Sequence, residues 1–172
     1  MMSIIILVVT LVIAGILSVS LLSEIRGHPK SIKLIGVKNN LKKCRELLLD
    51  DVNKAHHSFH MVLSYYYKPL FDPEEISNAF RDAKKRGVDI KIITGRLEKT
   101  ENILVPLHNE NVLALYMAKD FPLQNFRVVD TKTVHIEQGT LRESEHCLFS
   151  RYENNRFKAL KYEKNFRQYL SR

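Results

Sequence analysis

The chain begins with a continuous apolar segment. Residues 4–22 carry no charge, and only Thr10, Ser18 and Ser20 interrupt the run of apolar residues. At about 1.5 Å per residue, a helix of roughly 19 residues covers about 28 Å, close to the ~30 Å hydrocarbon core of a bilayer. The pattern therefore predicts a transmembrane anchor over residues 1–25, followed by a separate domain over residues 26–172.

A cleavable signal peptide is the alternative for this segment. The apolar part of a signal peptide usually spans about 7–15 residues and follows a basic start. Here no Lys or Arg precedes Arg26, although the small residues near Ser18 and Ser20 leave cleavage open. The basic residues Arg26, Lys30 and Lys33 come directly after the segment. Because basic flanks stay in the cytoplasm, we expect a single-pass protein of the cell membrane with its domain on the cytoplasmic side.

Helical and extended patterns alternate along the domain. Apolar residues at helical spacing predict helices, and short runs of β-branched and aromatic residues predict strands. We expect helices over 39–55, 72–86, 98–108 and 155–170, and strands over 32–35, 59–65, 88–94, 112–117, 126–129 and 133–137, with 147–150 as a further candidate.

Two of these helices have clear features. Asp72-Pro73-Glu74-Glu75 is typical of a helix start, and Lys84-Lys85-Arg86 followed by Gly87 is typical of a helix end. The last helix is basic, and its apolar side is expected to consist of Phe157, Leu160, Phe166 and Leu170.

The order of elements indicates an α/β domain. Strands separated by helices favour parallel pairing with helices covering the faces of the sheet. Residues 126–129 and 133–137 form a hairpin across Asp130-Thr131-Lys132 instead, so the sheet is expected to be mixed. About 145 residues suffice for one hydrophobic core.

Composition limits the function classes. The net charge is +8, and the domain carries +9 because Glu24 is the only charged residue before residue 26. Such a balance favours nucleic acid, a lipid surface or phosphorylated molecules as partners, although a basic surface also serves solubility alone. Two cysteines are too few for a disulfide scaffold, and the spacing of His56, His57 and His60 is not that of a zinc site. We expect no metal and no cofactor.

The segment from Asn78 to Glu137 resembles one half of the phospholipase D superfamily. The resemblance rests on RGVDIKIITG after a helix, a second αβ unit, and then NFRVVDTKTVHIE on a strand–turn–strand. It implies a phospholipase D-like mixed sheet flanked by helices. It also implies a homodimer, because two such halves pack together in that superfamily and only one half is present here.

The chain departs from the superfamily at its His-x-Lys-x4-Asp motif. If Asp130 takes the motif's Asp position, the Lys falls on Asn125 and the His on Leu123. The resemblance assigns the His as the nucleophile and the Lys as the group that holds the phosphoryl oxygens. Leu123 has no lone pair to attack phosphorus, and Asn125 brings no charge to the developing anion. His135, the histidine of this hairpin, is followed two residues later by Glu137 and not by a Lys, so the usual hydrolytic mechanism is not expected.

A remnant of this site is predicted to bind phosphate. Arg127 shares a strand face with positions 123 and 125 and could offer a bidentate fork, while His135 and Glu137 share a face of the next strand. Alternatively, Arg127 and Glu137 form a cross-strand ion pair on a half-exposed hairpin, and Asp130 is a turn residue. The candidate ligand-binding residues are Asn125, Arg127, Asp130, His135 and Glu137.

Two classes of function remain. The first is a membrane-anchored, catalytically inactive phospholipase D-like module that binds an anionic group on a lipid, a nucleic acid or a partner. The second is an active phosphodiesterase or nuclease with a rearranged site that uses His135 as its nucleophile. A scaffold domain that only dimerises is a weaker third idea.

Overall fold

The computed structural model describes residues 29–35, 37–64, 68–71, 74–95, 103–118, 124–138 and 146–171. Within these ranges, no helix combines the length and the apolar character needed to cross a bilayer. The apolar segment 4–22 and the expected boundary at residue 25 lie outside the described residues, so the anchor stays a prediction.

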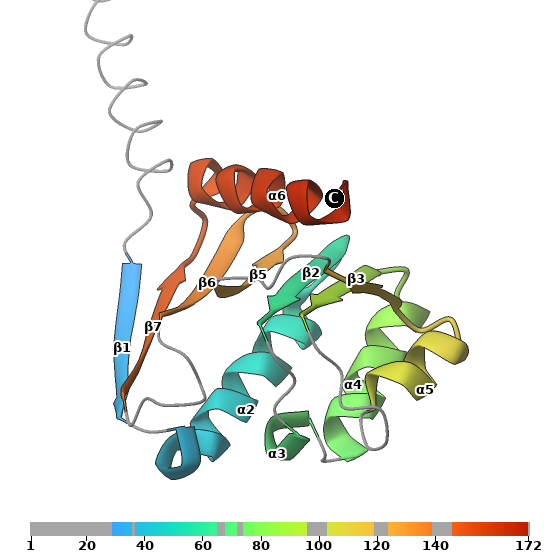
Figure 1. The fold of residues 1–172 in the computed structure, drawn as a ribbon, viewed down its shortest axis with the longest axis horizontal. Coiled ribbons are helices and arrows are strands. Elements are labelled where there is room, and N and C mark those ends of the chain that lie inside the picture. The colour runs from blue at the N-terminus through green and yellow to red at the C-terminus, as the bar shows by residue number, and fades with distance from the viewer. Residues whose placement is uncertain are drawn as a thin grey trace, which may run out of the picture.

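A seven-stranded sheet forms the centre of the domain (Figure 1). The strand order is β1-β7-β6-β5-β2-β3-β4. In chain order the elements are β1 (Pro29–Ile35), α2 (Val37–Lys54), β2 (Ser58–Leu63), α3 (Lys68–Phe71), α4 (Glu74–Lys85), β3 (Asp89–Thr94), α5 (Leu104–Asn109), β4 (Ala114–Met117), β5 (Asn125–Val129), β6 (Thr133–Gln138), β7 (His146–Tyr152) and α6 (Arg156–Leu170).

The sheet is mixed, as the sequence predicted. β2, β3 and β4 pair in parallel through helical crossovers. The other pairs are antiparallel: β5 pairs with β2, β6 with β5, and β7 with β6. β1 does not pair with β2, although a helix separates them. It pairs antiparallel with β7 at the far edge of the sheet, so α2 carries the chain across the sheet from β1 to β2.

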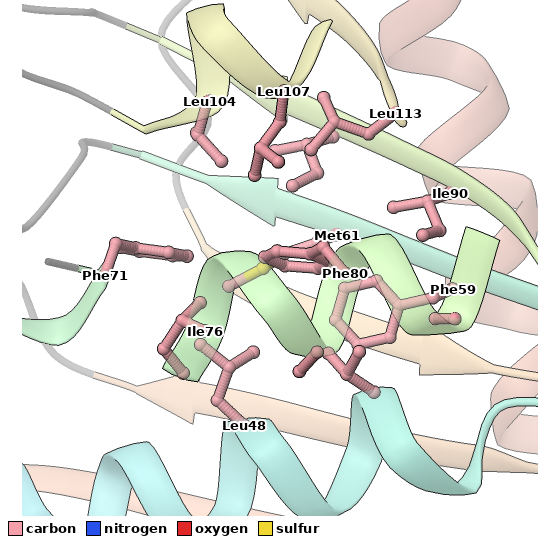
Figure 2. Packing of buried hydrophobic residues seen from close by; sticks show 14 of the residues in the cluster. Leu48, Phe59, Met61, Phe71, Ile76, Phe80, Ile90, Leu104, Leu107 and Leu113 are labelled. Atoms are coloured by element: carbon pink, nitrogen blue, oxygen red, sulfur yellow. The ribbon is translucent and has the colours of Figure 1, made fainter. Parts of the chain in front are cut away.

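Helices cover both faces of the sheet. On one face, α2, α4 and α5 pack over a large apolar cluster in which Phe59 and Phe80 meet edge to face, with ring centroids 5.8 Å apart (Figure 2). On the other face, α6 packs over a smaller cluster that contains Val62, Val128 and Phe166 (Figure 1). Alternation along the strands therefore sends successive side chains to different helical layers.

The Arg86-Gly87-Val88 sequence has a local structural role. Arg86 donates from its guanidinium to the carbonyl of Val52, at 3.0 Å, near the end of α2. Gly87 has φ +85°, which suits glycine, and its N–H donates to Lys84 at 2.9 Å to close α4. Val88 is buried and leads directly into β3. The three residues join α2, α4 and β3.

The structure differs from the sequence prediction in three helices, α3, α5 and α6. The short helix α3 was not anticipated, and α5 begins at Leu104, with Pro106 tolerated in its first turn. The predicted apolar side of α6 is mostly wrong. Phe166 is buried, but Phe157 and Leu160 are 66% and 49% exposed, and so is Leu170 at 38%. Ala159 and Glu163 take the buried positions, because Glu163 pairs with a histidine beneath the helix.

Candidate functional site

Polar side chains of the β5–β6 hairpin gather on the face of the sheet that α2 covers. Asn125 lies opposite Glu137 in the register, and Arg127 lies opposite His135. The intervening Phe126 and Val128 point to the α6 layer. The hairpin therefore brings together four of the five predicted ligand-binding residues, and all four are buried. We call these four residues, with Asp51 of α2 and Arg151 of β7, the polar cluster.

Arg127 is the centre of the polar cluster. Its Nε pairs with Asp51 Oδ2, and its terminal nitrogens lie 3.4 Å from Glu137 Oε1 and 2.9 Å from His135 Nδ1. The Arg127 side chain is only 3% exposed. The cross-strand ion pair with Glu137 is thus present, but it is enclosed by α2 rather than half-exposed. Phosphate binding by this guanidinium stays a prediction, and it would require these contacts to open.

Sequence reasoning missed Asp51 and Arg151. Asp51 Oδ1 lies 3.2 Å from a terminal nitrogen of Arg151, which also donates to Asp50 Oδ2 at 2.8 Å. Asp51 therefore bridges two arginines. The available signal was its position, because Asp51 falls on the same helix face as the apolar Leu48. A charged residue on the buried face of a helix needs a partner in the core.

The cluster shifts the titration of its members. Burial alone would raise the pKa of Asp51, but the positive charges of Arg127 and Arg151 hold that pKa well below its usual range. Burial raises the pKa of Glu137 despite the nearby Arg127. Burial together with the charge of Arg127 lowers the pKa of His135 to about 4. Since a guanidinium only donates, the contact with Arg127 assigns Nδ1 of the neutral His135 ring as an acceptor and the ring proton to Nε2. The same Nδ1 also lies 3.4 Å from Asp51 Oδ2.

Asn125 stands where the phospholipase D-like motif has its lysine. Its Oδ1 accepts from the backbone N–H of Ser64 at 2.6 Å, and its Nδ2 donates to Glu137 Oε2 at 3.2 Å. The residue is 4% exposed. Its amide is therefore engaged within the protein on both sides. Leu123, at the motif's histidine position, lies outside the described residues.

Asp130 does not join the polar cluster. It lies in the turn between β5 and β6, with φ 51°, and Thr131 beside it also has φ 51°. The Asp130 carboxylate accepts from the backbone N–H groups of His56, His57 and Ser58 at 3.0, 2.7 and 2.8 Å. Its pKa is lowered because these bonds together outweigh the effect of burial. Asp130 is thus a turn residue that ties the hairpin to the start of β2.

Other candidate sites are limited. Across the described ranges, no group of three His, Cys, Asp or Glu side chains is arranged to hold a metal ion. A hollow of about 250 Å³ opens on the α6 side of the sheet, away from the polar cluster, and it is lined by Gln124, Phe126, Asn165, Gln168 and Tyr169. Its lining carries amide and phenol groups but no charged side chain.

A family profile matches more than half of the chain. The profile described as "Cardiolipin synthase, PLD-like domain" matches residues 48–150, a segment that runs from α2 to β7. The chain belongs to this family of phospholipase D-like domains. The comparison with curated proteins gave no match.

Solved structures share the fold at low sequence identity. A phospholipase D family member, Nuc from Salmonella typhimurium, aligns with a TM-score of 0.60 and 19% identity over 84% of this chain and 95% of its own. NucT from Helicobacter pylori gives a TM-score of 0.60 and 12% identity over 84% and 97%. TrmBL2, an archaeal chromatin protein, gives 0.55 and 17% over 82% and 52%. At these identities the likeness concerns the fold alone.

Proposed function

We propose that the chain is a membrane-anchored phospholipase D-like module that has lost phosphodiesterase activity and binds a phosphate-bearing anion. The observation that carries the proposal is the state of the motif. Leu123 and Asn125 replace its histidine and lysine, and the Asn125 amide is held by Ser64 and Glu137. Without a nucleophile and a phosphate-holding cation, the family's reaction loses both its covalent step and its charge stabilisation.

The alternative nucleophile is poorly placed. His135 is 1% exposed beneath α2, and its Nδ1 already accepts from Arg127 at 2.9 Å. A nucleophile must reach phosphorus within about 3–3.5 Å, which requires a substrate beside the imidazole. The surroundings of His135 support a role in the core instead of a role in covalent catalysis.

The anchoring half of the proposal is tested by extraction. The uncharged segment 4–22 supports an anchor that remains on the mature chain. After an alkaline carbonate wash of membranes, the full-length chain should stay in the membrane pellet. Recovery in the supernatant of a shorter product that lacks roughly the first 20 residues, the usual length of a signal peptide, would contradict the anchor.

The anion-binding half is tested by salt dependence. The net charge of +8 supports attraction to phosphate-bearing surfaces. Full chain in neutral detergent should bind a phosphocellulose resin at low salt and elute as salt rises, because each phosphate contact releases a counterion. Passage through the resin at low salt would contradict this half, whatever the outcome of the extraction.

A further inference from the structure

The exposed side of α6 combines apolar and basic residues. Phe157 and Leu160 are 66% and 49% exposed, and they lie one helical turn apart. Lys161 and Lys164 are exposed on the same side, four residues after Phe157 and Leu160 respectively. We call these four residues the α6 outer face.

The packing of α6 fixes which side points outward. Phe166 stacks on the His60 ring with centroids 4.7 Å apart, and Glu163 Oε2 lies 2.8 Å from His60 Nδ1. Ala159 is fully buried on the same side. At the start of the helix, Asn155 accepts from the Lys158 N–H at 3.0 Å. These contacts hold α6 in one rotation, so the α6 outer face turns away from the sheet.

The helix α6 carries an excess of positive charge, and part of this charge is not paired with carboxylates of the described residues. The helix carries five basic residues and one acid, Glu163, which is buried against His60. Arg167 keeps a 3.5 Å contact with Glu163, and Lys158 lies over the Tyr152 ring at 3.3 Å. Among the described residues, no carboxylate pairs with Arg156, Lys161 or Lys164. A basic helix with large apolar side chains on its exposed side is typical of helices that lie at a membrane interface.

The fold places this face beside the entry of the N-terminal segment. Pro29, the first residue of β1, pairs with Tyr152 at the end of β7. Arg156 begins α6 only four residues after Tyr152, and β1 and the start of α6 lie at the same end of the sheet (Figure 1). The N-terminal end of β1 therefore lies at the end of the sheet where α6 begins.

We propose that the α6 outer face lies on an anionic membrane surface, with Phe157 and Leu160 entering the headgroup region and Lys161 and Lys164 contacting lipid phosphates. This inference rests on the anchoring half of the proposed function and gives the phosphate-bearing anion as a lipid headgroup. Each interfacial lysine contributes about a five-fold preference for the docked state, so the two together contribute on the order of 30-fold.

A tryptophan reporter tests the contact directly. The chain has no Trp, so Phe157→Trp places a single tryptophan on the α6 outer face. The full chain is reconstituted into vesicles of phosphatidylcholine, with and without phosphatidylglycerol. With phosphatidylglycerol we expect blue-shifted emission that brominated lipids quench and that weakens with salt. Val105→Trp is the matched control, because Val105 is 39% exposed on α5, across the sheet from α6. The emission maximum of the Val105→Trp variant should stay at the long wavelength of a water-exposed tryptophan, and brominated lipids should not quench it.

Charge variants in the Phe157→Trp background separate a lipid contact from simple exposure. Lys161→Gln with Lys164→Gln should lower the ratio of docked to undocked chain about 30-fold. Lys84→Gln with Lys85→Gln, on exposed positions of α4, should leave it unchanged. Equal losses from both pairs would overturn the assignment to α6.

Three further outcomes would also overturn the proposal. The first is emission of the Phe157→Trp variant that is the same in neutral and anionic vesicles. The second is emission of this variant that matches that of the Val105→Trp control. The third is a shift produced by a short DNA in neutral vesicles but not by phosphatidylglycerol, which would assign the face to nucleic acid. Release of the chain by carbonate would contradict the anchor alone, because emission recorded on the vesicles before the wash still decides the α6 contact.

Discussion

Arg127 and Asp51 form an ion pair enclosed between β5 and α2, although 76 residues separate them in the sequence. Their side chains are 3% and 1% exposed. Burying two charges costs desolvation, so such a pair adds little net stability but makes each partner depend on the other. The pair links the β5–β6 hairpin to α2. It also engages the Arg127 guanidinium, which the sequence analysis predicted to bind phosphate.

Loss of Arg127 should destabilise the domain strongly. Arg127→Met leaves the buried Asp51 with Arg151 and the neutral His135 imidazole beside it, and the free energy of unfolding should fall by about 3 to 5 kcal/mol. Chemical denaturation of the full chain in mild detergent, followed by circular dichroism, measures this. Adding Asp51→Leu should restore part of the loss, because the unpaired charge is then gone. Arg81→Met, which breaks an exposed pair with Glu110, serves as the control and should change little.

The free energy of unfolding should decrease as pH falls from 6.5 towards 4, because the pKa of His135 is lowered in the folded state. An unfolded histidine has a pKa of 6.5, whereas that of folded His135 is lowered to about 4. Between these values the unfolded chain binds a proton that the folded chain does not. The free energy of unfolding is therefore fully retained above pH 6.5 and falls towards pH 4 by at most about 1.4 kcal/mol per pH unit.

His135→Gln isolates this contribution. Glu137 acts in the opposite direction, because its raised pKa makes the folded state gain stability as pH falls through that pKa. Glu137 is present in both proteins, so the difference between the wild-type and His135→Gln denaturation midpoints reports His135. We expect a shallower loss in the variant between pH 6.5 and pH 4. Parallel curves for the two proteins would show that His135 keeps an ordinary titration.

Most of the fold follows from local signals in the sequence. The Arg86-Gly87 helix end and the hairpin turn at Asp130 could both be predicted, because capping and turn chemistry act within a few residues. The position of β1 was not readable. Its pairing with β7 joins residues more than 100 positions apart, and neither strand carries a local mark of its partner.

The polar cluster was readable only in part. Alternation along the hairpin placed Asn125 with Arg127, and His135 with Glu137, on common faces. Alternation cannot say which face a helix covers, so the burial of these residues went unforeseen. On α6 the pattern of apolar and charged residues also failed to identify the buried side, because Glu163 is buried. A charged residue at a buried position of α6, paired with His60, led the prediction to the wrong apolar side.

Asp130 should be structural. Asp130→Ala leaves three backbone N–H groups without their acceptor, and we expect a loss of about 2 to 4 kcal/mol in the free energy of unfolding. Asp130→Asn should cost less, because Asn keeps one acceptor oxygen and tolerates a positive φ. Asp82→Ala, at an exposed acid of α4, is the control. Denaturation midpoints in this order support the assignment, whereas equal midpoints for both Asp130 variants would argue against it.

The chain should associate as a homodimer. The resemblance to one half of a two-half superfamily predicts it, because an unpaired half would leave an apolar face exposed to water. Light scattering on full chain in detergent, corrected for the bound detergent, measures the mass. We expect a mass twice that of the 20.0 kDa chain. A uniform monomer at tens of micromolar, a concentration at which a stable interface remains formed, would be the opposite result.

Hydrolysis of a phosphodiester tests the central claim most directly. Full-length wild type, His135→Gln and His108→Gln are incubated with a phosphodiester that has nitrophenyl leaving groups, and product release is compared with buffer. His108 is an exposed histidine of α5 and serves as the matched control. Because Leu123 and Asn125 supply neither a nucleophile nor a phosphate-holding cation, all three proteins should release product at the buffer rate. Turnover above buffer in wild type and His108→Gln that disappears in His135→Gln would contradict the account and establish an enzyme with a rearranged site.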